Sequence, residues 1–216
     1  MGSEKGRTAS ALETYYPEVF DCIETRDINS LNPLCTKICY DARLAAFAYN
    51  QRRYPPIYRA GPITPEDLSA LERFAGKADR TDQIYEDDLG DPIRSLLFVA
   101  LWKDGNLRRI RDLCDGARDT VAGTPYEPGD HSKGWYSLGR HWGSGGKEPL
   151  LDKNVVRAFL VYRRNYRLVD EEIRSPGKED FREYHDWLAA KGFDPDELFV
   201  VHKTLFTLGQ ATKTLN

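Results

Sequence analysis

The feature that most constrains this chain is the spacing of its apolar residues, which recur in steps of three and four almost from end to end. Such steps place side chains on one face of an α-helix. They occur over residues 12–23, 68–75, 93–101, 107–117, 155–160, 181–188 and 198–208. We therefore expect an all-α fold, in the form of a compact multi-helix domain.

Local start and stop signals support several of these helices. Asp152 and the pair Asp194-Pro195 are typical of a helix start. The second signal favours a helix over a strand for the β-branched residues that follow it. Pro17 is expected to delay the first helix, and Gly209 is expected to end the last one. Residues 40–49 are apolar nearly all round, which indicates a further, buried helix.

Length and composition favour one domain spanning residues 1–216. A hydrophobic content of 40% and a charged content of 30% are those of an ordinary globular protein. No apolar run is long enough to span a bilayer, and the first residues lack the apolar stretch of a signal peptide. We therefore expect a cytoplasmic protein that has no membrane contact and is a monomer.

The cysteines favour the same compartment. A chain without an export signal stays in a reducing environment, so its four cysteines are expected to be thiols. Cys35 and Cys39 have the spacing of half a metal site, but no second close pair exists and the histidines are scattered. We expect no metal and no cofactor.

Charge is distributed unevenly along the chain. The net charge is −3, whereas nucleic-acid-binding domains are often basic. Residues 133–168, however, contain eight lysines and arginines and only two acids. Two interpretations are open for this segment: a surface that faces DNA phosphates, or solvated helix faces that pair with the acids of the remaining chain.

Residues 128–160 contain the densest group of candidate functional residues. A tight turn over 128–133, with the sequence Pro-Gly-Asp-His-Ser-Lys, leads into a short helix that is rich in aromatic and basic residues. A glycine-rich loop follows at 143–146, and then the apolar pair Leu150-Leu151 precedes Asp152. The glycine-rich loop lacks the Gly-Lys-Ser/Thr ending of a phosphate-binding loop.

This order of features resembles the helix-hairpin-helix DNA glycosylase superfamily, most of all its 8-oxoguanine type. Pro128, Gly129 and Lys133 fall on the hairpin positions, and Asp152 falls on the position of the family's aspartate. The degenerate helix-hairpin-helix element covers about residues 118–167. The sequence departs from the family at His131, where the hairpin has a second glycine, and at its leading leucine, which is glutamate here.

The resemblance implies an active site with a carboxylate and, in some members, a lysine. Cleavage of an N-glycosidic bond builds positive charge on the sugar, which the carboxylate of Asp152 would stabilise. Lys133 would attack the sugar as an amine nucleophile and add lyase activity. A rival alignment places Arg140 on the lysine position, and an arginine cannot act as that nucleophile. The alternative for Asp152 is the simpler role of helix N-cap.

The resemblance also implies groups that contact DNA. The target base must leave the stack and enter an aromatic pocket. Candidates for binding the flipped base are Trp135, Tyr136, His141 and Trp142. Candidates for binding DNA are Gly129, His131, Arg140, Lys147, Lys153, Arg163 and Arg164. The alternatives are a core position for the aromatic residues, a satisfied polar group for the histidine, and solvated helix charges for the arginines.

The resemblance therefore implies a DNA glycosylase that excises a damaged or modified base from duplex DNA by base flipping. Its partner would be double-stranded DNA carrying that base, in repair or in defence against modified phage DNA. The alternative is a non-catalytic helical module that binds DNA or another protein.

Overall fold

A computed structural model describes residues 4–42, 108–127, 133–166, 168 and 176–215. These residues form seven helices and no strand, so the predicted all-α class is confirmed. The chain divides into two compact units, one formed by Met1–Pro55 with Leu151–Asn216, and the other by Pro56–Leu150. The assignment of residues 1–216 to a single domain stays a prediction.

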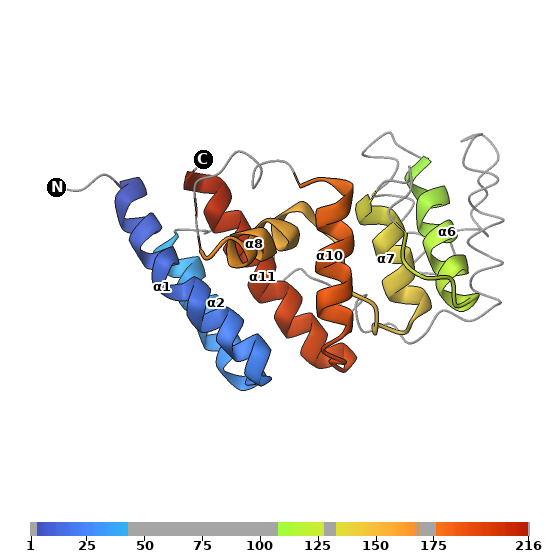
Figure 1. The fold of residues 1–216 in the computed structure, drawn as a ribbon, viewed down its shortest axis with the longest axis horizontal. Coiled ribbons are helices and arrows are strands. Elements are labelled where there is room, and N and C mark those ends of the chain that lie inside the picture. Colours follow the sequence, from blue (N-terminus) through green and yellow to red (C-terminus); the bar gives the residue numbers. More distant parts are fainter. Residues whose placement is uncertain (1–3, 43–107, 128–132, 167, 169–175, 216) are drawn as a thin grey trace, which may run out of the picture. The chain divides into compact units, whose positions relative to one another are not determined.

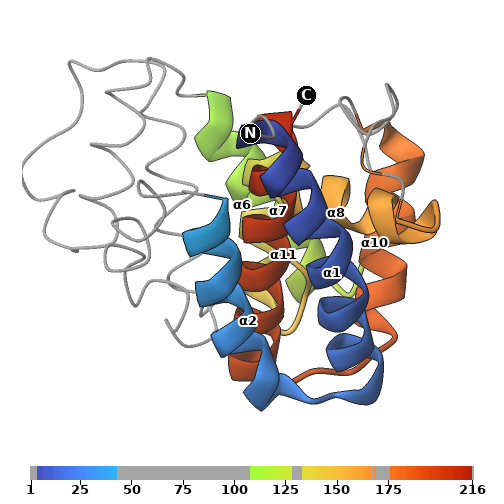
Figure 2. The same cartoon turned by 90° about the vertical axis from the view of Figure 1, so that its left-hand side faces the viewer.

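The first unit contains five of these helices (Figure 1). They are α1 (Glu4–Thr25), α2 (Ile28–Asp41), α8 (Lys153–Arg163), α10 (Lys178–Ala189) and α11 (Pro195–Leu215). Helix α11 contacts α1, α2 and α8, and Figure 2 shows it running alongside α1 and α2. Its inward positions Leu198, Val201, Leu205 and Leu208 are all buried, as the spacing predicts.

Helix α1 is longer than expected, because Pro17 lies inside it instead of delaying its start. A proline within a helix removes one backbone hydrogen bond. Helix α1 tolerates this loss while Tyr16, Val19, Phe20 and Ile23 are all fully buried. Burial of side chains of this size is worth about 1.5–3 kcal/mol each, which together exceeds the local cost of the proline.

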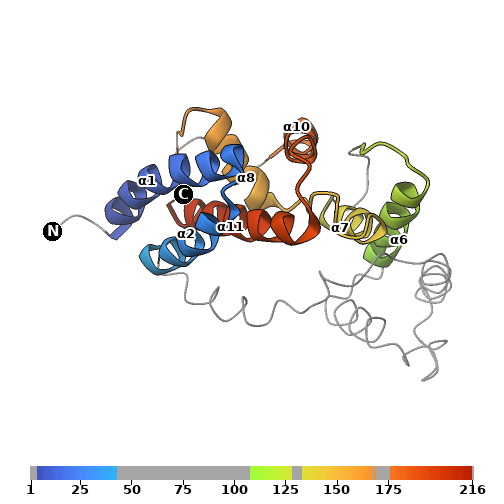
Figure 3. The same cartoon turned by 90° about the horizontal axis from the view of Figure 1, so that it is seen from below.

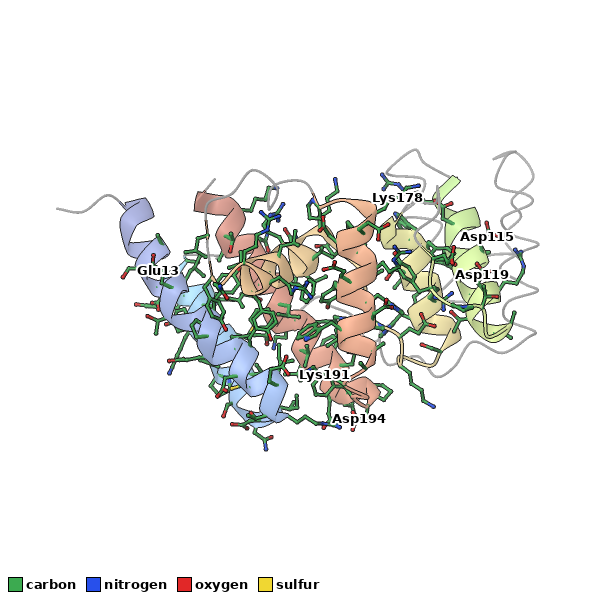
Figure 4. All side chains as sticks on the ribbon, viewed as in Figure 1. Glu13, Asp115, Asp119, Lys178, Lys191 and Asp194 are labelled. Atoms are coloured by element: carbon green, nitrogen blue, oxygen red, sulfur yellow. The ribbon has the colours of Figure 1, made fainter. Side chains whose placement is uncertain are left out.

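A carboxylate connects α1 with two other helices of the unit. Glu24 accepts hydrogen bonds from Tyr162 of α8 at 3.3 Å and from Trp187 of α10 at 3.2 Å. It also forms an ion pair with Lys191, which is labelled in Figure 4. The ring of Phe20 stacks on that of Tyr162 at 4.2 Å between centroids. Polar and aromatic contacts together therefore hold α1 against α8 and α10.

Helix α2 was not predicted from the sequence, whose apolar pattern indicated a helix over residues 40–49. Its buried residues Leu31, Leu34, Cys35 and Ile38 follow the helical spacing, but Pro33 interrupts the pattern. Residues 43–49 lie outside the described part of the chain. The helices predicted around 68–75 and 93–101 lie outside it as well.

The predicted end of the last helix is wrong, because α11 continues through Gly209 to Leu215. Gly209 marks a close approach between two backbones. A Cβ atom at this position would lie 1.9 Å from the carbonyl oxygen and 2.6 Å from the carbonyl carbon of Asn154 in α8. Glycine is required here for space, and its ability to end a helix is not used.

The described helices of the second unit are α6 (Arg108–Val121) and α7 (Lys133–Gly143), which pack against each other (Figure 3). Two glycines allow this contact. A Cβ atom on Gly116 would lie 2.0 Å from the carbonyl oxygen of Tyr136, and one on Gly139 would lie 1.9 Å from that of Leu113. The two helix backbones therefore approach more closely than any larger residue would permit.

Two predictions, on the state of the cysteines and on membrane-spanning helices, can be compared with the described residues. All four cysteines are described, and no disulfide joins them. None of the helices in the described ranges combines the length and the apolar character needed to cross a bilayer.

Candidate functional site

Asp152 has the geometry of a helix N-cap, as its position before an apolar run predicts. Its backbone is extended, with φ −118° and ψ 152°, and its Oδ1 atom accepts a hydrogen bond from the N–H of Asn154 at 2.7 Å. The residue is exposed. The capping role alone accounts for an aspartate at this position, so a catalytic role depends on the family resemblance.

The first turn of α8 is held in place by α11. Nη1 of Arg157 donates to Oδ1 of Asn154 at 2.6 Å and to the carbonyl oxygen of Gly209 at 3.4 Å. Burial lowers the pKa of the Arg157 guanidinium, while electrostatic interactions with Tyr16 and with the carboxylate of Asp152 oppose this shift. The close backbone contact at Gly209 and this buried guanidinium together fix where Asp152 lies in the unit.

The predicted hairpin lies almost wholly outside the described residues. Gly129 and His131 belong to residues 128–132, which the structure does not describe. Lys133 is the first residue of α7, and it belongs to the second unit, whereas Asp152 belongs to the first. The proximity of Lys133 to Asp152 therefore stays a prediction.

Of the three predicted stacking residues, two are core residues of the second unit. Tyr136 is 4% exposed and Trp142 is 5% exposed, whereas Trp135 is half-buried. The hydroxyl of Tyr136 donates to Oδ2 of Asp119 at 2.7 Å; Asp119, labelled in Figure 4, belongs to α6. Tyr136 and Trp142 thus take the core position that the sequence left open, and Trp135 is the most accessible of the three.

Arg140 is buried in an internal ion pair, although the sequence analysis placed it on a DNA-binding surface. Its Nε and Nη2 atoms donate to the two carboxylate oxygens of Glu148, each at 2.6 Å, and Nη2 also donates to the carbonyl oxygen of Thr124 at 2.8 Å. Its side chain is 3% exposed. A DNA phosphate has no access to such a group, and this placement corrects the expectation.

The structural role of Glu148 could not be recognised from the sequence, where this residue is one of only two acids in a basic segment. An acid eight positions after a buried arginine gives no local pattern. The fork of Arg140 and the two oxygens of Glu148 form a bidentate pair, which is the strongest geometry for such an interaction.

The glycine-rich loop after α7 is held by hydrogen bonds that Ser144 makes with nearby backbone groups. The hydroxyl oxygen of Ser144 accepts hydrogen bonds from the N–H groups of Lys147 at 3.1 Å and Glu148 at 2.9 Å. Its own hydroxyl donates to the carbonyl oxygen of His141 at 2.8 Å. The N–H groups of Lys147 and Glu148 therefore already donate to Ser144 and are not available to a bound phosphate. This agrees with the absence of a Gly-Lys-Ser/Thr ending from the loop sequence.

His141 is a satisfied polar group in the interior of the second unit. Its Nδ1 atom lies 2.7 Å from the carbonyl oxygen of Glu148, and the residue is 3% exposed. Burial lowers the pKa of the imidazole, and the backbone and charge of Glu148 only partly oppose this. An imidazole in this position holds the loop against α7 and is not open to a flipped base.

This lowered pKa predicts an acid-dependent loss of stability. The unfolded chain binds a proton at His141 below about pH 6.5, whereas the folded chain binds it only at lower pH. The contribution of neutral His141 to the free energy of unfolding is therefore fully present above about pH 6.5. It decreases as the pH falls below this value, by up to about 1.4 kcal/mol per pH unit. Urea unfolding of the wild type and of His141→Gln across this range measures it. A difference in the free energy of unfolding between the two proteins that does not change with pH would contradict the prediction.

The remaining basic candidates are divided between the two units. Lys147 is exposed in the second unit, and Lys153 is exposed at the start of α8 in the first. Arg163 lies 3.5 Å from Glu183 in an exposed ion pair, and Arg164 is half-buried. Arg163 is therefore a solvent-exposed helix charge that pairs with an acid, which is the alternative to DNA binding stated for it above. Lys147 and Lys153 remain accessible to a DNA phosphate.

The described residues contain no group of three or more His, Cys, Asp and Glu side chains that could hold a metal ion. The chain was also compared with known proteins. No family model, no curated protein and no solved structure matches it.

Proposed function

We infer that this protein is a DNA glycosylase that excises a damaged or modified base from duplex DNA, with Asp152 as its essential carboxylate. The proposal starts from the family resemblance of residues 128–160, and the structural observation that supports it is the orientation and exposure of Asp152. One carboxylate oxygen is held by the N–H of Asn154, while the residue as a whole remains exposed. An oriented and accessible carboxylate is what stabilisation of a positively charged sugar requires.

The reaction follows from this arrangement. The bond between C1′ of the sugar and the base nitrogen breaks, and the base leaves with the electron pair and takes up a proton from solvent. The carboxylate of Asp152 stabilises the positive charge that forms on the sugar. Water then adds its oxygen to C1′ and releases a proton, to Asp152 or to solvent, so that the product is a free base and an abasic sugar.

A lysine nucleophile would change the second half of this reaction. The amine of Lys133 would attack C1′ in place of water and form a covalent intermediate that leads to strand cleavage. The burial of Arg140 and its pairing with Glu148 support Lys133 as the residue on the family's lysine position. This mechanism requires the side chain of Lys133 to reach the sugar that Asp152 contacts.

The charge of Asp152 can be removed without removing the helix cap. Asparagine caps helices as well as aspartate does, so Asp152→Asn is expected to change the free energy of unfolding by less than about 0.5 kcal/mol. Release of base is expected to fall by about a hundredfold or more, since a charge near the transition state is lost. The measurement uses duplex oligonucleotides that carry different modified bases.

A second helix cap in the same unit provides the control. Oδ1 of Asp194 accepts a hydrogen bond from the N–H of Glu197 at 2.9 Å at the start of α11, and Asp194 is labelled in Figure 4. Asp194→Asn removes the same charge from an equivalent cap and should leave activity intact. Base release that survives in Asp152→Asn would exclude the catalytic role. In the same assay, borohydride trapping that is lost in Lys133→Ala identifies the amine mechanism.

The non-catalytic helical module remains the second candidate. It is favoured by the burial of Tyr136, Trp142 and Arg140, which removes three of the groups assigned to the DNA site. A module of this kind would bind without releasing a base. A steep fall in affinity with salt would then identify DNA as its partner, and absence of DNA binding would favour a protein partner.

A further inference from the structure

Two cysteines, Cys35 and Cys39, lie one helical turn apart on α2, which runs alongside α11 (Figure 2). Cys35 is 0% exposed, Cys39 is half-buried, and no disulfide joins them. Side chains four positions apart on a helix are neighbours, with about 5–6 Å between their Cβ atoms. The thiol of Cys39 accordingly forms a hydrogen bond with that of Cys35. The first unit therefore contains a pair of adjacent thiols that takes no part in the proposed base excision.

Helix α11 supplies the polar surroundings of these two thiols. Sγ of Cys35 lies 3.3 Å from Oγ1 of Thr207. The hydroxyl of Thr207 donates its one proton to the carbonyl oxygen of Lys203 at 2.7 Å, so Oγ1 is the acceptor for the thiol of Cys35. Nζ of Lys203 donates to Oδ1 of Asn32 on α2 at 3.3 Å. An ammonium group therefore lies between the two helices that enclose the thiols.

The metal-free pair is expected to be resistant to oxidation. The hydrogen bond with Cys35 and burial raise the pKa of the Cys39 thiol, and the charge of Lys203 opposes this rise only in part. The thiolate is the form that reacts with oxidants, so a protonated Cys39 is inert at neutral pH. A disulfide also needs about 3.8 Å between Cβ atoms, which is less than two positions one helical turn apart provide.

The same spacing suits two ligands of one metal ion. At a metal–sulfur distance of about 2.3 Å, two sulfur atoms on opposite sides of an ion stand about 4.6 Å apart. Side chains whose Cβ atoms are about 5–6 Å apart reach this separation without a change in the helix. Two thiolates are also preferred ligands of soft ions such as Cu(I).

The number of ligands favours a two-coordinate ion over zinc. Structural zinc is held by four side chains in a tetrahedral arrangement. In the ranges that the structure describes, no three His, Cys, Asp and Glu side chains come together as they would in such a site. Cu(I) is stable with two sulfur ligands in a line, and the α2 pair provides two.

We propose that Cys35 and Cys39 bind one soft, two-coordinate metal ion of the Cu(I) class between their sulfur atoms. Two metal–sulfur bonds form and two S–H bonds break, and both protons pass to solvent without any oxidation. The resulting Cu(I) bis-thiolate has one negative charge, which the ammonium of Lys203 offsets. Cys39 is the ligand that the ion reaches first, because it is the more exposed of the two.

The test is an anaerobic competition for Cu(I) between the reduced full chain and the chelator bathocuproine disulfonate, whose copper complex is coloured. The wild type is expected to remove one equivalent of Cu(I) from the chelator. Cys39→Ser is expected to abolish this transfer, because a hydroxyl is a poor ligand for a soft ion. Circular dichroism checks that the variant keeps its helices.

Cys22→Ser is the matched control. Cys22 is half-buried on α1, as Cys39 is on α2, and it also belongs to no disulfide. It has no second cysteine within four positions of sequence. This variant should take one equivalent of Cu(I) from the chelator, as the wild type does.

Labelling with N-ethylmaleimide, followed by mass spectrometry, tests the site in the wild type without any substitution. Bound Cu(I) is expected to protect Cys39 from the reagent, because its sulfur is then a metal ligand. Cys22 should react at the same rate with and without the ion.

Four results would overturn the metal site. They are failure of the wild type to take Cu(I) from the chelator, transfer that continues in Cys39→Ser, transfer that is lost in Cys22→Ser, and Cys39 labelling that Cu(I) leaves unchanged. Each would show that the ligands are not the thiols of α2. Base release is measured separately with Asp152→Asn, so failure of the metal site and failure of the glycosylase are distinguishable.

Discussion

Gly209→Ala is expected to lower the free energy of unfolding of the first unit by about 3 kcal/mol or more. The new Cβ atom would lie 1.9 Å from the carbonyl oxygen of Asn154 and 3.0 Å from its Cα atom. These are backbone atoms, so the clash cannot be relieved by a side-chain rotation, and α8 and α11 must separate. Overpacking in a core costs about 1–3 kcal/mol, and more where the backbone has to move.

The measurement is urea unfolding followed by circular dichroism, with hydrogen exchange to locate the loss in α8 and α11. Gly192→Ala is the control, because a Cβ atom there meets nothing within 4 Å and only the positive φ of 61° opposes the change. Its expected cost is about 1–2 kcal/mol. Equal effects of the two variants would contradict the tight backbone contact. If Asp152 is catalytic, Gly209→Ala also reduces base release in the fraction that remains folded, because Asn154 adjoins the cap.

Glu148→Ala is expected to destabilise the second unit by about 3 kcal/mol, because it leaves the buried guanidinium of Arg140 without a counter-charge. The side chain of Arg140 is 3% exposed, and both of its bonds to Glu148 measure 2.6 Å. The side chain of Glu148 is itself only 22% exposed, so water can replace the lost carboxylate only in part. Urea unfolding combined with hydrogen exchange in α6 and α7 measures the effect.

Two further variants test the cause. Asp115→Ala removes an acid from the pair with Arg118, whose side chain is 51% exposed, and should cost no more than about 0.5 kcal/mol. Replacing both partners, as Arg140→Met with Glu148→Leu, should recover most of the loss, since an apolar pair has no unpaired charge to bury. A double variant as unstable as Glu148→Ala alone would show that the loss does not come from the unpaired charge.

The helical class and the helix starts could be predicted because their causes are local. An apolar face needs only the spacing of nearby residues, and the caps at Asp152 and Asp194 bond to N–H groups two and three positions away. The same local rules failed at Pro17 and Gly209. At Pro17 the burial of the flanking helix outweighs a missing hydrogen bond, and at Gly209 the glycine serves a neighbouring helix.

The candidate site was predicted less completely, because exposure is decided by what packs against a residue. Nothing in the local sequence separates a surface arginine from Arg140, which is buried against Glu148, or a stacking aromatic from Tyr136, which bonds to Asp119.

The sequence by itself determined that the chain is helical and that Asp152 opens a helix, since both follow from contacts within about one turn. Only the tertiary structure decided which charged and aromatic side chains remain accessible, and what holds the start of α8. Arg157 reaches the carbonyl of Gly209 across 52 positions of sequence. Contacts of that range depend on how whole helices pack, and packing is a property of the folded chain.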